Sequence, residues 1–264
     1  MESSGPSTSL GADALEELRA KVAMSCRILA MVGVVHDILG HVSARVPGSD
    51  EMLIRCRGDD EFGVAFTGPS AIRRLDFDGR GPGLGGDHVP VSELPIHGET
   101  YKARPEVGCV IHAHPPGVLL CGIAGVELRP VYGAYDPGGM QLALDGIPVF
   151  PRSVLISRPE LARPMLEVMG DKPLVVMRGH GVTVTGRSVE EATIRTIHLE
   201  RLARVCWHLA TKGPLPTISP EDVEDFGRRG RTPAAGSRSE EWVWRSYARL
   251  VEEGRQSLDL LPTL

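Results

Sequence analysis

The strongest constraint on the fold is the alternation of helix-like and strand-like patterns along the 264-residue chain. Residues 12–35 place apolar side chains at helical spacing, which predicts a helix with one face on a core. Similar patterns recur at 93–104, 159–170, 189–211 and 240–254. Short apolar or alternating runs bounded by Gly, Pro or Asp lie at 41–48, 51–58, 63–70, 107–114 and 173–186. These runs predict strands and turns, so the chain is expected to form a layered α/β domain.

Three serines are predicted to begin helices. Ser92 is a candidate N-cap for the helix at 93–104. Ser157 with Glu160, and Ser188 with Glu191, match the capping-box pattern ahead of the helices at 159–170 and 189–211.

Composition excludes several broad classes of function. A net charge of −5 and only 5% aromatic residues disfavour nucleic acid and acidic membranes as partners. The five cysteines are widely spaced without a CxxC pair, so reduced, buried thiols are expected. No apolar run approaches about 20 residues, and the N-terminus lacks the pattern of a signal peptide. A cytoplasmic protein is therefore expected.

His112 and His114 are two residues apart in a strand-like run, so both imidazoles are predicted to face the same side of a sheet. His180 lies between two glycines and two β-rich runs, which predicts a tight turn that presents its ring. Three histidine ligands with an open position are typical of a catalytic metal site. Zinc, iron, manganese and cobalt all suit such ligands, and the sequence does not choose among them.

Glu93 and His97 are one helical turn apart and could form a proton donor–acceptor pair beside that metal. The helix dipole alone could also account for a carboxylate at the helix start. His41 lies in a predicted turn and by itself indicates nothing specific.

Together these residues resemble the class II aldolase/adducin family over roughly residues 12–212. The resemblance rests on GHVSAR (40–45), SELPIHGETYKARPEVGCVIHAH (92–114) and RGHGVTVTGRSVEEA (178–192). It implies a three-layer α/β/α fold around a mostly antiparallel sheet. It also implies that Glu93 is catalytic and that His112, His114 and His180 bind one divalent metal ion per subunit.

The resemblance further implies a homotetramer with active sites at subunit interfaces. The polar N-terminus predicts a flexible tail at residues 1–11, the resemblance assigns 12–212 to the catalytic domain, and the polar, Pro-rich composition after Gly213 predicts a C-terminal extension at 213–264 that forms an interface. A cluster of Trp242, Trp244 and Tyr247 lies in that extension.

Two departures from the family pattern bear on the substrate. The turn that holds phosphate in the family's sugar-phosphate aldolases becomes Ile38-Leu39-Gly40-His41, and its serine pair becomes Val91-Ser92. Ile38 and Val91 offer no side-chain hydrogen bonds, so the phosphate cradle is impaired. His41 adds a possible proton donor. The GHVS form resembles the branch that decarboxylates aromatic and pyridine dicarboxylates.

The expected activity is therefore that of a metal-dependent carbon–carbon lyase. A decarboxylase of a hydroxylated aromatic dicarboxylate, such as a dihydroxyphthalate, is favoured. Glu93, His97 or His41 would supply the proton, and Arg178 and Ser92 would bind the substrate. Open alternatives are an aldolase acting on a non-phosphorylated hydroxy-carbonyl compound, a non-haem iron oxygenase of the same fold, and a non-catalytic scaffold like the adducin head.

Overall fold

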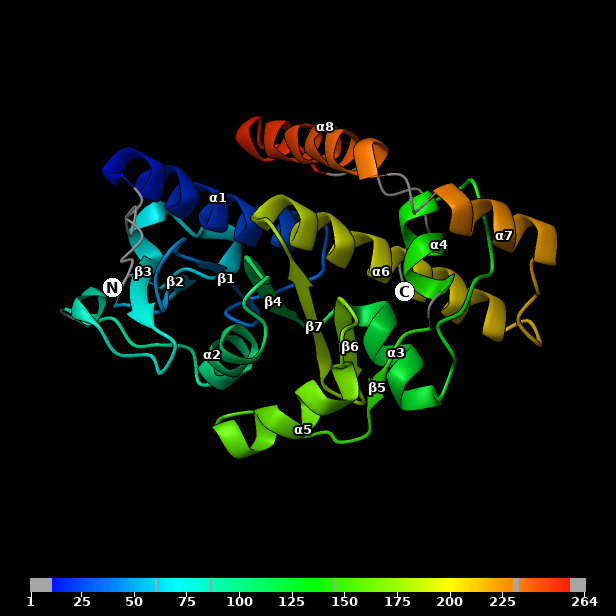
Figure 1. The fold of residues 1–264 in the computed structure, drawn as a ribbon, viewed down its shortest axis with the longest axis horizontal. Coiled ribbons are helices and arrows are strands. Elements are labelled where there is room, and N and C mark those ends of the chain that lie inside the picture. The colour runs from blue at the N-terminus through cyan, green and yellow to red at the C-terminus, as the bar shows by residue number, and fades with distance from the viewer. Residues whose placement is uncertain (1–10, 60, 86, 145, 230–232, 257–264) are drawn as a thin grey trace, which may run out of the picture.

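A single seven-stranded sheet forms the centre of the molecule in the computed structural model, which describes residues 11–59, 61–85, 87–144, 146–229 and 233–256 (Figure 1). The strand order is β3-β2-β1-β4-β7-β6-β5. The strands are β1 (His41–Arg45), β2 (Glu51–Arg55), β3 (Ile72–Asp76), β4 (Cys109–Ala113), β5 (Val149–Phe150), β6 (Leu174–Met177) and β7 (Gly181–Gly186). Every neighbouring pair is antiparallel except β5 and β6. The predicted mostly antiparallel sheet is confirmed.

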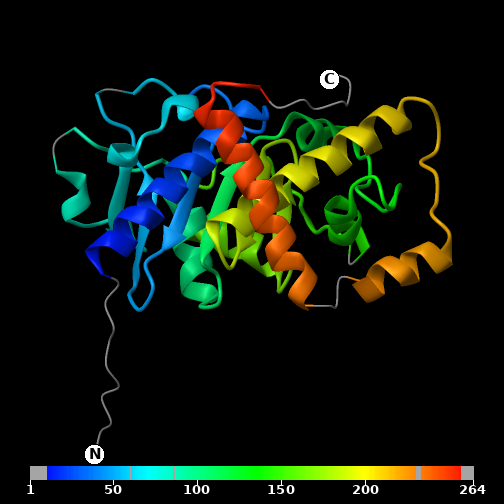
Figure 2. The ribbon, with the colours of Figure 1, turned by 90° about the horizontal axis from the view of Figure 1, so that it is seen from above.

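Helices cover both faces of this sheet. They are α1 (Ala12–Met31), α2 (Leu94–Ala103), α3 (Pro116–Ala124), α4 (Pro137–Leu144), α5 (Pro159–Met169), α6 (Val189–Ala210), α7 (Pro220–Arg229) and α8 (Pro233–Glu252). Helices α1 and α6 lie on one face, and α2 and α5 lie on the other (Figure 1). Helix α8 crosses outside α1 and α6 (Figure 2). The three-layer prediction is confirmed.

The two faces of the central strands β1, β4 and β7 differ in chemistry. Toward α1 and α6 they present only apolar side chains, namely Val42, Ala44, Cys109, Ile111, Ala113, Val182 and Val184. Burial of this surface contributes about 25 cal/mol per Å² to folding. Toward α2 and α5 the same strands present buried His41, Ser43, His112, Thr183 and Thr185. A second apolar cluster on that side lies mainly among β2, β6, α2 and α5.

The long helix α6 begins as predicted. The Ser188 hydroxyl accepts a hydrogen bond from the Glu191 backbone N–H at 3.1 Å, and α6 ends at Ala210. The Glu191 carboxylate in turn accepts a hydrogen bond from the backbone N–H of Arg187, one residue before the N-cap, at 2.6 Å. Such a cap satisfies donors that the first helical turn leaves free.

Other local predictions need correction. Glu93 rather than Ser92 is the N-cap of α2, and it makes no side-chain cap because its carboxylate is directed to the histidine cluster. Arg158 rather than Ser157 is the N-cap of α5, and it makes no side-chain cap. Residues 63–70 form two short 3₁₀ helices instead of a strand, since Pro69 removes a backbone donor. The first helix ends at Met31, four residues early.

The proposed N-terminal tail and C-terminal extension remain predictions. Of the proposed flexible tail, residues 1–10 lie outside the described residues. In the C-terminal extension, Trp244 and Tyr247 are buried against the core, whereas Trp242 is exposed. Within the described part of the chain, no helix combines the length and apolarity needed to cross a membrane.

Candidate metal centre

Four buried or nearly buried side chains converge at one end of strands β4 and β7. They are Glu93, His112, His114 and His180, and one ligand atom from each lies within 4.8 Å of all the others. The Nε2 atoms of His112 and His114 are 2.9 Å apart. Glu93 Oε2 lies 3.3 Å from Nε2 of His112 and 3.3 Å from Nε2 of His180. The predicted convergence of the three histidines is present in this geometry.

Strand register and turn geometry produce this convergence. His112 and His114 stand at alternate positions at the end of β4, so their rings share a side. His180 lies in the turn between β6 and β7, where Gly179 has a φ of +66°. A Cβ atom on Gly181 would lie 2.3 Å from the carbonyl oxygen of Ala113. Glycine is therefore required for the turn to approach β4 this closely.

The donor set fits a divalent cation. Neither ring nitrogen of His180 makes a hydrogen bond, and Nδ1 of His112 is also buried without one. Imidazole nitrogens about 2.0–2.1 Å from a tetrahedral zinc ion lie about 3.4 Å from one another, compared with 2.9 Å between the Nε2 atoms of His112 and His114. Burial lowers the pKa of His114 to about 4, helped by His112 and His180, so its ring is neutral and able to bind a metal at pH 7.

Glu93 is held in place by a neighbouring loop. Its Oε1 accepts a hydrogen bond from the backbone N–H of Ile156 at 2.7 Å, which leaves Oε2 facing the histidines. Burial raises the pKa of Glu93, but the imidazoles of His112 and His180, each 3.3 Å from Oε2, outweigh it and hold that pKa well below the usual value. The carboxylate can act as a fourth ligand or as a proton carrier.

A hydrogen-bonded chain leads away from this cluster. His41 Nδ1 lies 2.6 Å from His97 Nε2, and Ser43 Oγ lies 2.6 Å from His97 Nδ1. Tyr101 OH lies 2.8 Å from the same Ser43 oxygen. The His41 ring is centred 5.0 Å from the His112 ring. His97 is thus behind His41, with both nitrogens occupied, while His41 directly adjoins the metal ligands.

The two predicted substrate-binding residues lie at the surface. Ser92 and Arg178 are both exposed, and neither side chain makes a hydrogen bond within the described residues. Arg178 is two residues before His180, and Ser92 immediately precedes Glu93. Both side chains remain available to a ligand.

Sequence reasoning missed three residues that support the site. Ser43 and Tyr101 complete the chain behind His41. Glu200 on α6 accepts hydrogen bonds from the backbone N–H groups of Gly117 and Val118, at 3.0 and 3.2 Å, and so fixes the start of α3 just after His114. A helix N-terminus favours a carboxylate, but 83 residues separate Glu200 from Gly117 and no local pattern shows the pairing.

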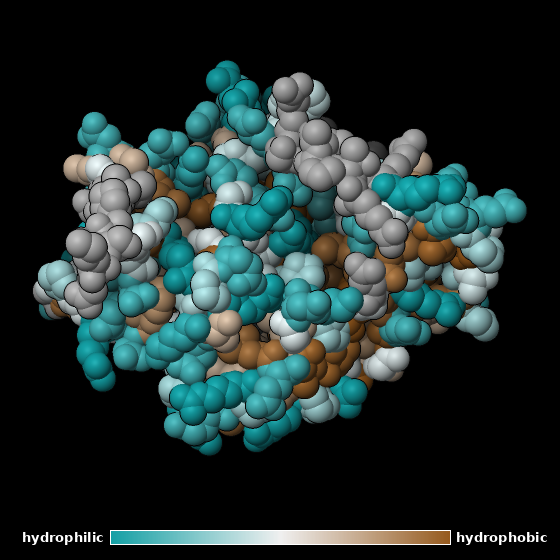
Figure 3. Space-filling model, viewed as in Figure 1, coloured by the Kyte–Doolittle hydropathy of each residue, from teal (hydrophilic) through white to brown (hydrophobic). Residues whose placement is uncertain are grey.

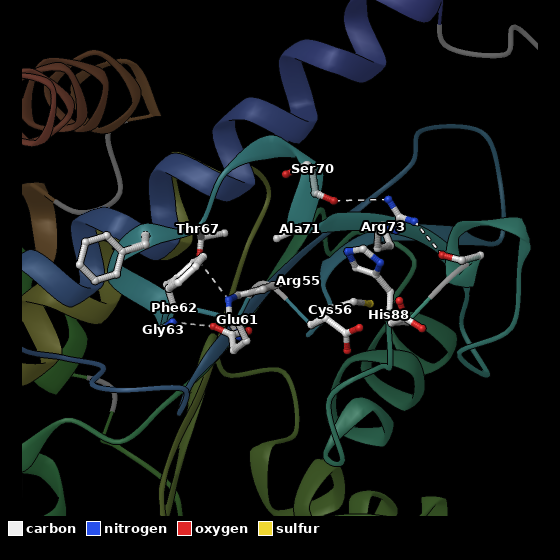
Figure 4. Close-up of a pocket in the computed structure, with 15 residues that line it drawn as sticks. Arg55, Cys56, Glu61, Phe62, Gly63, Thr67, Ser70, Ala71, Arg73 and His88 are labelled. Carbon is white, nitrogen blue, oxygen red and sulfur yellow. Dashed lines mark hydrogen bonds and ion pairs between the residues drawn. The ribbon is translucent and has the colours of Figure 1, made fainter.

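A separate pocket lies beyond β2, with a volume of about 360 Å³. Arg55 binds Thr67 and Glu61 on one side of it, and Arg73 and His88 lie on the other (Figure 4). Acidic and basic side chains both line this pocket, and none of the metal-ligand candidates does.

The fold and the motifs define the class of protein. The model of the Class II Aldolase and Adducin N-terminal domain matches residues 20–207. The chain therefore belongs to the class II aldolase/adducin family. An aldolase II superfamily protein from Pseudomonas syringae has the same fold, with a TM-score of 0.79 and 21% identity over 90% of this chain and 93% of that one.

Two curated relatives indicate a narrower class of enzyme within this family. The chain is 42% identical to a 3,4-dihydroxyphthalate decarboxylase of Rhodococcus jostii (strain RHA1), over 88% of this chain and 94% of that protein. It is 41% identical to a 3,4-dihydroxyphthalate decarboxylase of Arthrobacter keyseri, over 82% of this chain and 90% of that protein.

Proposed function

We propose that the protein is a metal-dependent decarboxylase of a hydroxylated aromatic dicarboxylate of the 3,4-dihydroxyphthalate kind. The observation that carries the proposal is the cluster of three histidine Nε2 atoms and one carboxylate at the end of β4 and β7. Identity of 41–42% to two decarboxylases with that substrate supports the choice of reaction. The lost phosphate cradle at Ile38 and Val91 argues against a sugar phosphate.

His112, His114 and His180 would hold one divalent ion. When bound, that ion would supply a Lewis acid that stabilises negative charge on a substrate oxygen as the carbon–carbon bond breaks. Zinc, iron, manganese and cobalt are all compatible with three imidazoles.

Protein groups around the ion have distinct roles in this proposal. Glu93, ionised in the resting protein, would take the proton of the substrate hydroxyl on Oε2 and return it to the ring carbon that loses the carboxylate, since Oε1 is committed to Ile156. His41 is the nearer of the two other candidate acids, and His97 would act through it. Arg178 would pair with the retained carboxylate, because a guanidinium can bind both of its oxygens. Ser92 would donate a further hydrogen bond.

The test is product analysis with purified, metal-loaded protein. Incubation with 3,4-dihydroxyphthalate should release one carbon dioxide per dihydroxybenzoate formed, and EDTA should stop the reaction. L-Fuculose 1-phosphate and similar sugar phosphates should not be cleaved. Cleavage of a sugar phosphate without turnover of any hydroxylated aromatic dicarboxylate would overturn the proposal in favour of an aldolase.

A homotetramer with active sites at subunit interfaces is part of the proposal. Phe62 and Phe66 are each 74% exposed, and Ile38 and Leu39 beside His41 are also exposed. A hydrophobic band also lies above α5 in the view of Figure 3. Ile123 on α3 and Leu155 between β5 and α5 are exposed as well. Apolar surface of this kind is typical of subunit contacts. Light scattering after gel filtration should give four times the 28.4 kDa chain mass.

The domain boundaries and the cellular compartment are also part of this proposal. Residues 12–212 would form the catalytic domain, and 213–264 an extension that adds to the interface through exposed residues such as Trp242. All five cysteines are buried and free, which suits a reducing compartment such as the cytoplasm.

A further inference from the structure

Four polar side chains form an unbroken hydrogen-bonded line between β1 and α2. His41 and Ser43 are alternate residues of β1, and His97 and Tyr101 are one turn apart on α2, so each pair shares a face. The order along the line is His41, His97, Ser43, Tyr101, with links of 2.6, 2.6 and 2.8 Å. All four side chains are at least nine-tenths buried.

Each hydrogen bond in this line contains one proton, which one of its two atoms must donate. Burial lowers the pKa of His97 to about 3, with a further contribution from His112. The His97 imidazole is therefore neutral at pH 7 and carries a single N–H. The whole line must consequently point one way, and the group at its end decides the direction.

Tyr101 is that end. Its ring stacks on Phe77 at 5.3 Å and lies under the Arg45 guanidinium, so neither neighbour offers an acceptor to the phenol. Burial raises the Tyr101 pKa well above its usual value, and a backbone hydrogen bond from Val110 partly opposes this by donating to the oxygen. Within the described residues, Ser43 Oγ is then the acceptor for the phenol proton. A buried O–H without an acceptor is strongly disfavoured.

The direction of the remaining links follows from this end. Tyr101 donates to Ser43, and the Ser43 hydroxyl donates to His97 Nδ1. His97 then carries its proton on Nε2 and donates it to His41 Nδ1. His41 must carry its own proton on Nε2, the ring nitrogen that makes no hydrogen bond to the described part of the chain.

We propose that Ser43 and Tyr101 are positioning residues that fix His41 with an N–H, rather than a lone pair, facing an anionic oxygen of the substrate beside the metal ligands. This inference rests on the proposed dicarboxylate substrate. An N–H donor attracts a carboxylate or phenolate oxygen, whereas a lone pair at the same position would repel it. This arrangement supplies a fixed donor at the start of β1, just after the predicted turn in which Ile38 offers no side-chain hydrogen bond.

The test is ¹⁵N NMR of histidine-labelled, zinc-loaded protein without substrate, since ring-nitrogen shifts distinguish the two tautomers. His41 and His97 should both be protonated at Nε2 and unprotonated at Nδ1. Tyr101→Phe removes the terminal donor and should give mixed tautomers at both rings. Tyr247→Phe removes a buried phenol on α8 that binds Arg201, and should leave both tautomers unchanged.

Steady-state kinetics provides the second measurement. Tyr101→Phe and Ser43→Ala should raise KM for the dicarboxylate about tenfold with little change in kcat, as expected for one lost hydrogen bond to a charged group. Ser43→Thr keeps the hydroxyl and should restore KM. An Nδ1 proton on His41 in the parent protein, or an unchanged KM in Tyr101→Phe, would overturn this inference. Failure of the parent to decarboxylate, with Nε2 protons observed, would overturn the proposed function instead.

Discussion

The two faces of strands β1, β4 and β7 illustrate how one set of backbones serves two purposes. On the α1 and α6 side, Val42, Ile111 and Val184 belong to a continuous apolar core. On the other side, their sequence neighbours Ser43, His112 and Thr183 are buried and polar. Alternation along each strand separates the two sets, and Val110 of β4 is an apolar residue on the polar side.

The two faces differ in how their buried side chains are stabilised. The apolar face is satisfied by packing alone, so any side chains of suitable volume would serve. The polar face contains buried nitrogens without hydrogen-bond partners, such as Nδ1 of His112 and Nδ1 of His180. Buried polar groups are costly unless they are bonded, so this face is complete only with a cation. Stability should therefore depend on the first face, and chemistry on the second.

Loss of a metal ligand should have the largest effect. His112→Ala and His180→Ala should each lower kcat/KM by about 10³-fold or more, since they remove the ion and its Lewis acidity. Metal analysis should show less than one ion per chain in these variants. The exposed His36 provides a control, because His36→Ala leaves the ligand set intact. Full activity in either ligand variant would remove the metal from the account.

Glu93→Gln should keep the metal and lose rate. The amide preserves shape and the contact with Ile156 but cannot carry the proton, so kcat should fall by roughly 10²–10⁴-fold. Metal content should remain at one ion per chain. Parent-like turnover would exclude a proton-carrying role, and loss of metal would make Glu93 a ligand instead.

The apolar face should respond in stability rather than in chemistry. Ile111→Ala should lower the free energy of unfolding by about 2–5 kcal/mol, because it leaves a cavity between the sheet and its helices. Urea denaturation measures this loss. Well below the melting temperature, kcat per bound metal should be unchanged. A large fall in kcat there would show that the two faces are not separable.

Acid should lower the free energy of unfolding through His97 on the polar face. The folded-state pKa of His97 is about 3, against about 6.5 in an unfolded chain, so the unfolded state binds the extra proton first. The unfolding free energy of metal-free protein should therefore fall as the pH drops from about 6.5 toward 3. Urea unfolding at several pH values measures the slope. Ile111→Val should shift the whole curve without altering that slope.

Loss of the N-cap of α6, which lies outside both faces of the sheet, should have the smallest effect. Ser188→Ala removes the N-cap of α6 and should cost about 1 kcal/mol of unfolding free energy. Calorimetry should show a lower melting temperature with unchanged metal content. Ser157→Ala should be nearly neutral, since Ser157 does not cap α5.

Sequence patterns predicted what depends on local periodicity or on a recognisable motif. The layered α/β class, the helix at 189–210 with its Ser188 cap, and the shared face of His112 and His114 are of this kind. The position of His180 beside them needed the family resemblance, because 66 residues separate His114 from His180 and only the tertiary fold brings them together.

What escaped prediction depends on long-range contacts. Ser43 and Tyr101 are ordinary strand and helix residues until β1 packs on α2. Ser92 is a good N-cap by residue type, yet α2 begins one residue later, and the Glu93 carboxylate at the N-cap position is directed to the histidines instead of to the helix. Residues 63–70 had strand-like composition, but Pro69 and the approach of Gly63 to Asp37 impose turns.

The central claim is that three imidazoles distant in sequence hold the ion that the reaction needs. Metal-free protein should be titrated with a divalent ion while bound metal and carbon dioxide release from 3,4-dihydroxyphthalate are measured together. The account predicts that the rate rises in proportion to bound metal and saturates at one ion per chain, and that His180→Ala shows neither. Carbon dioxide release at the full rate from metal-free protein would contradict it.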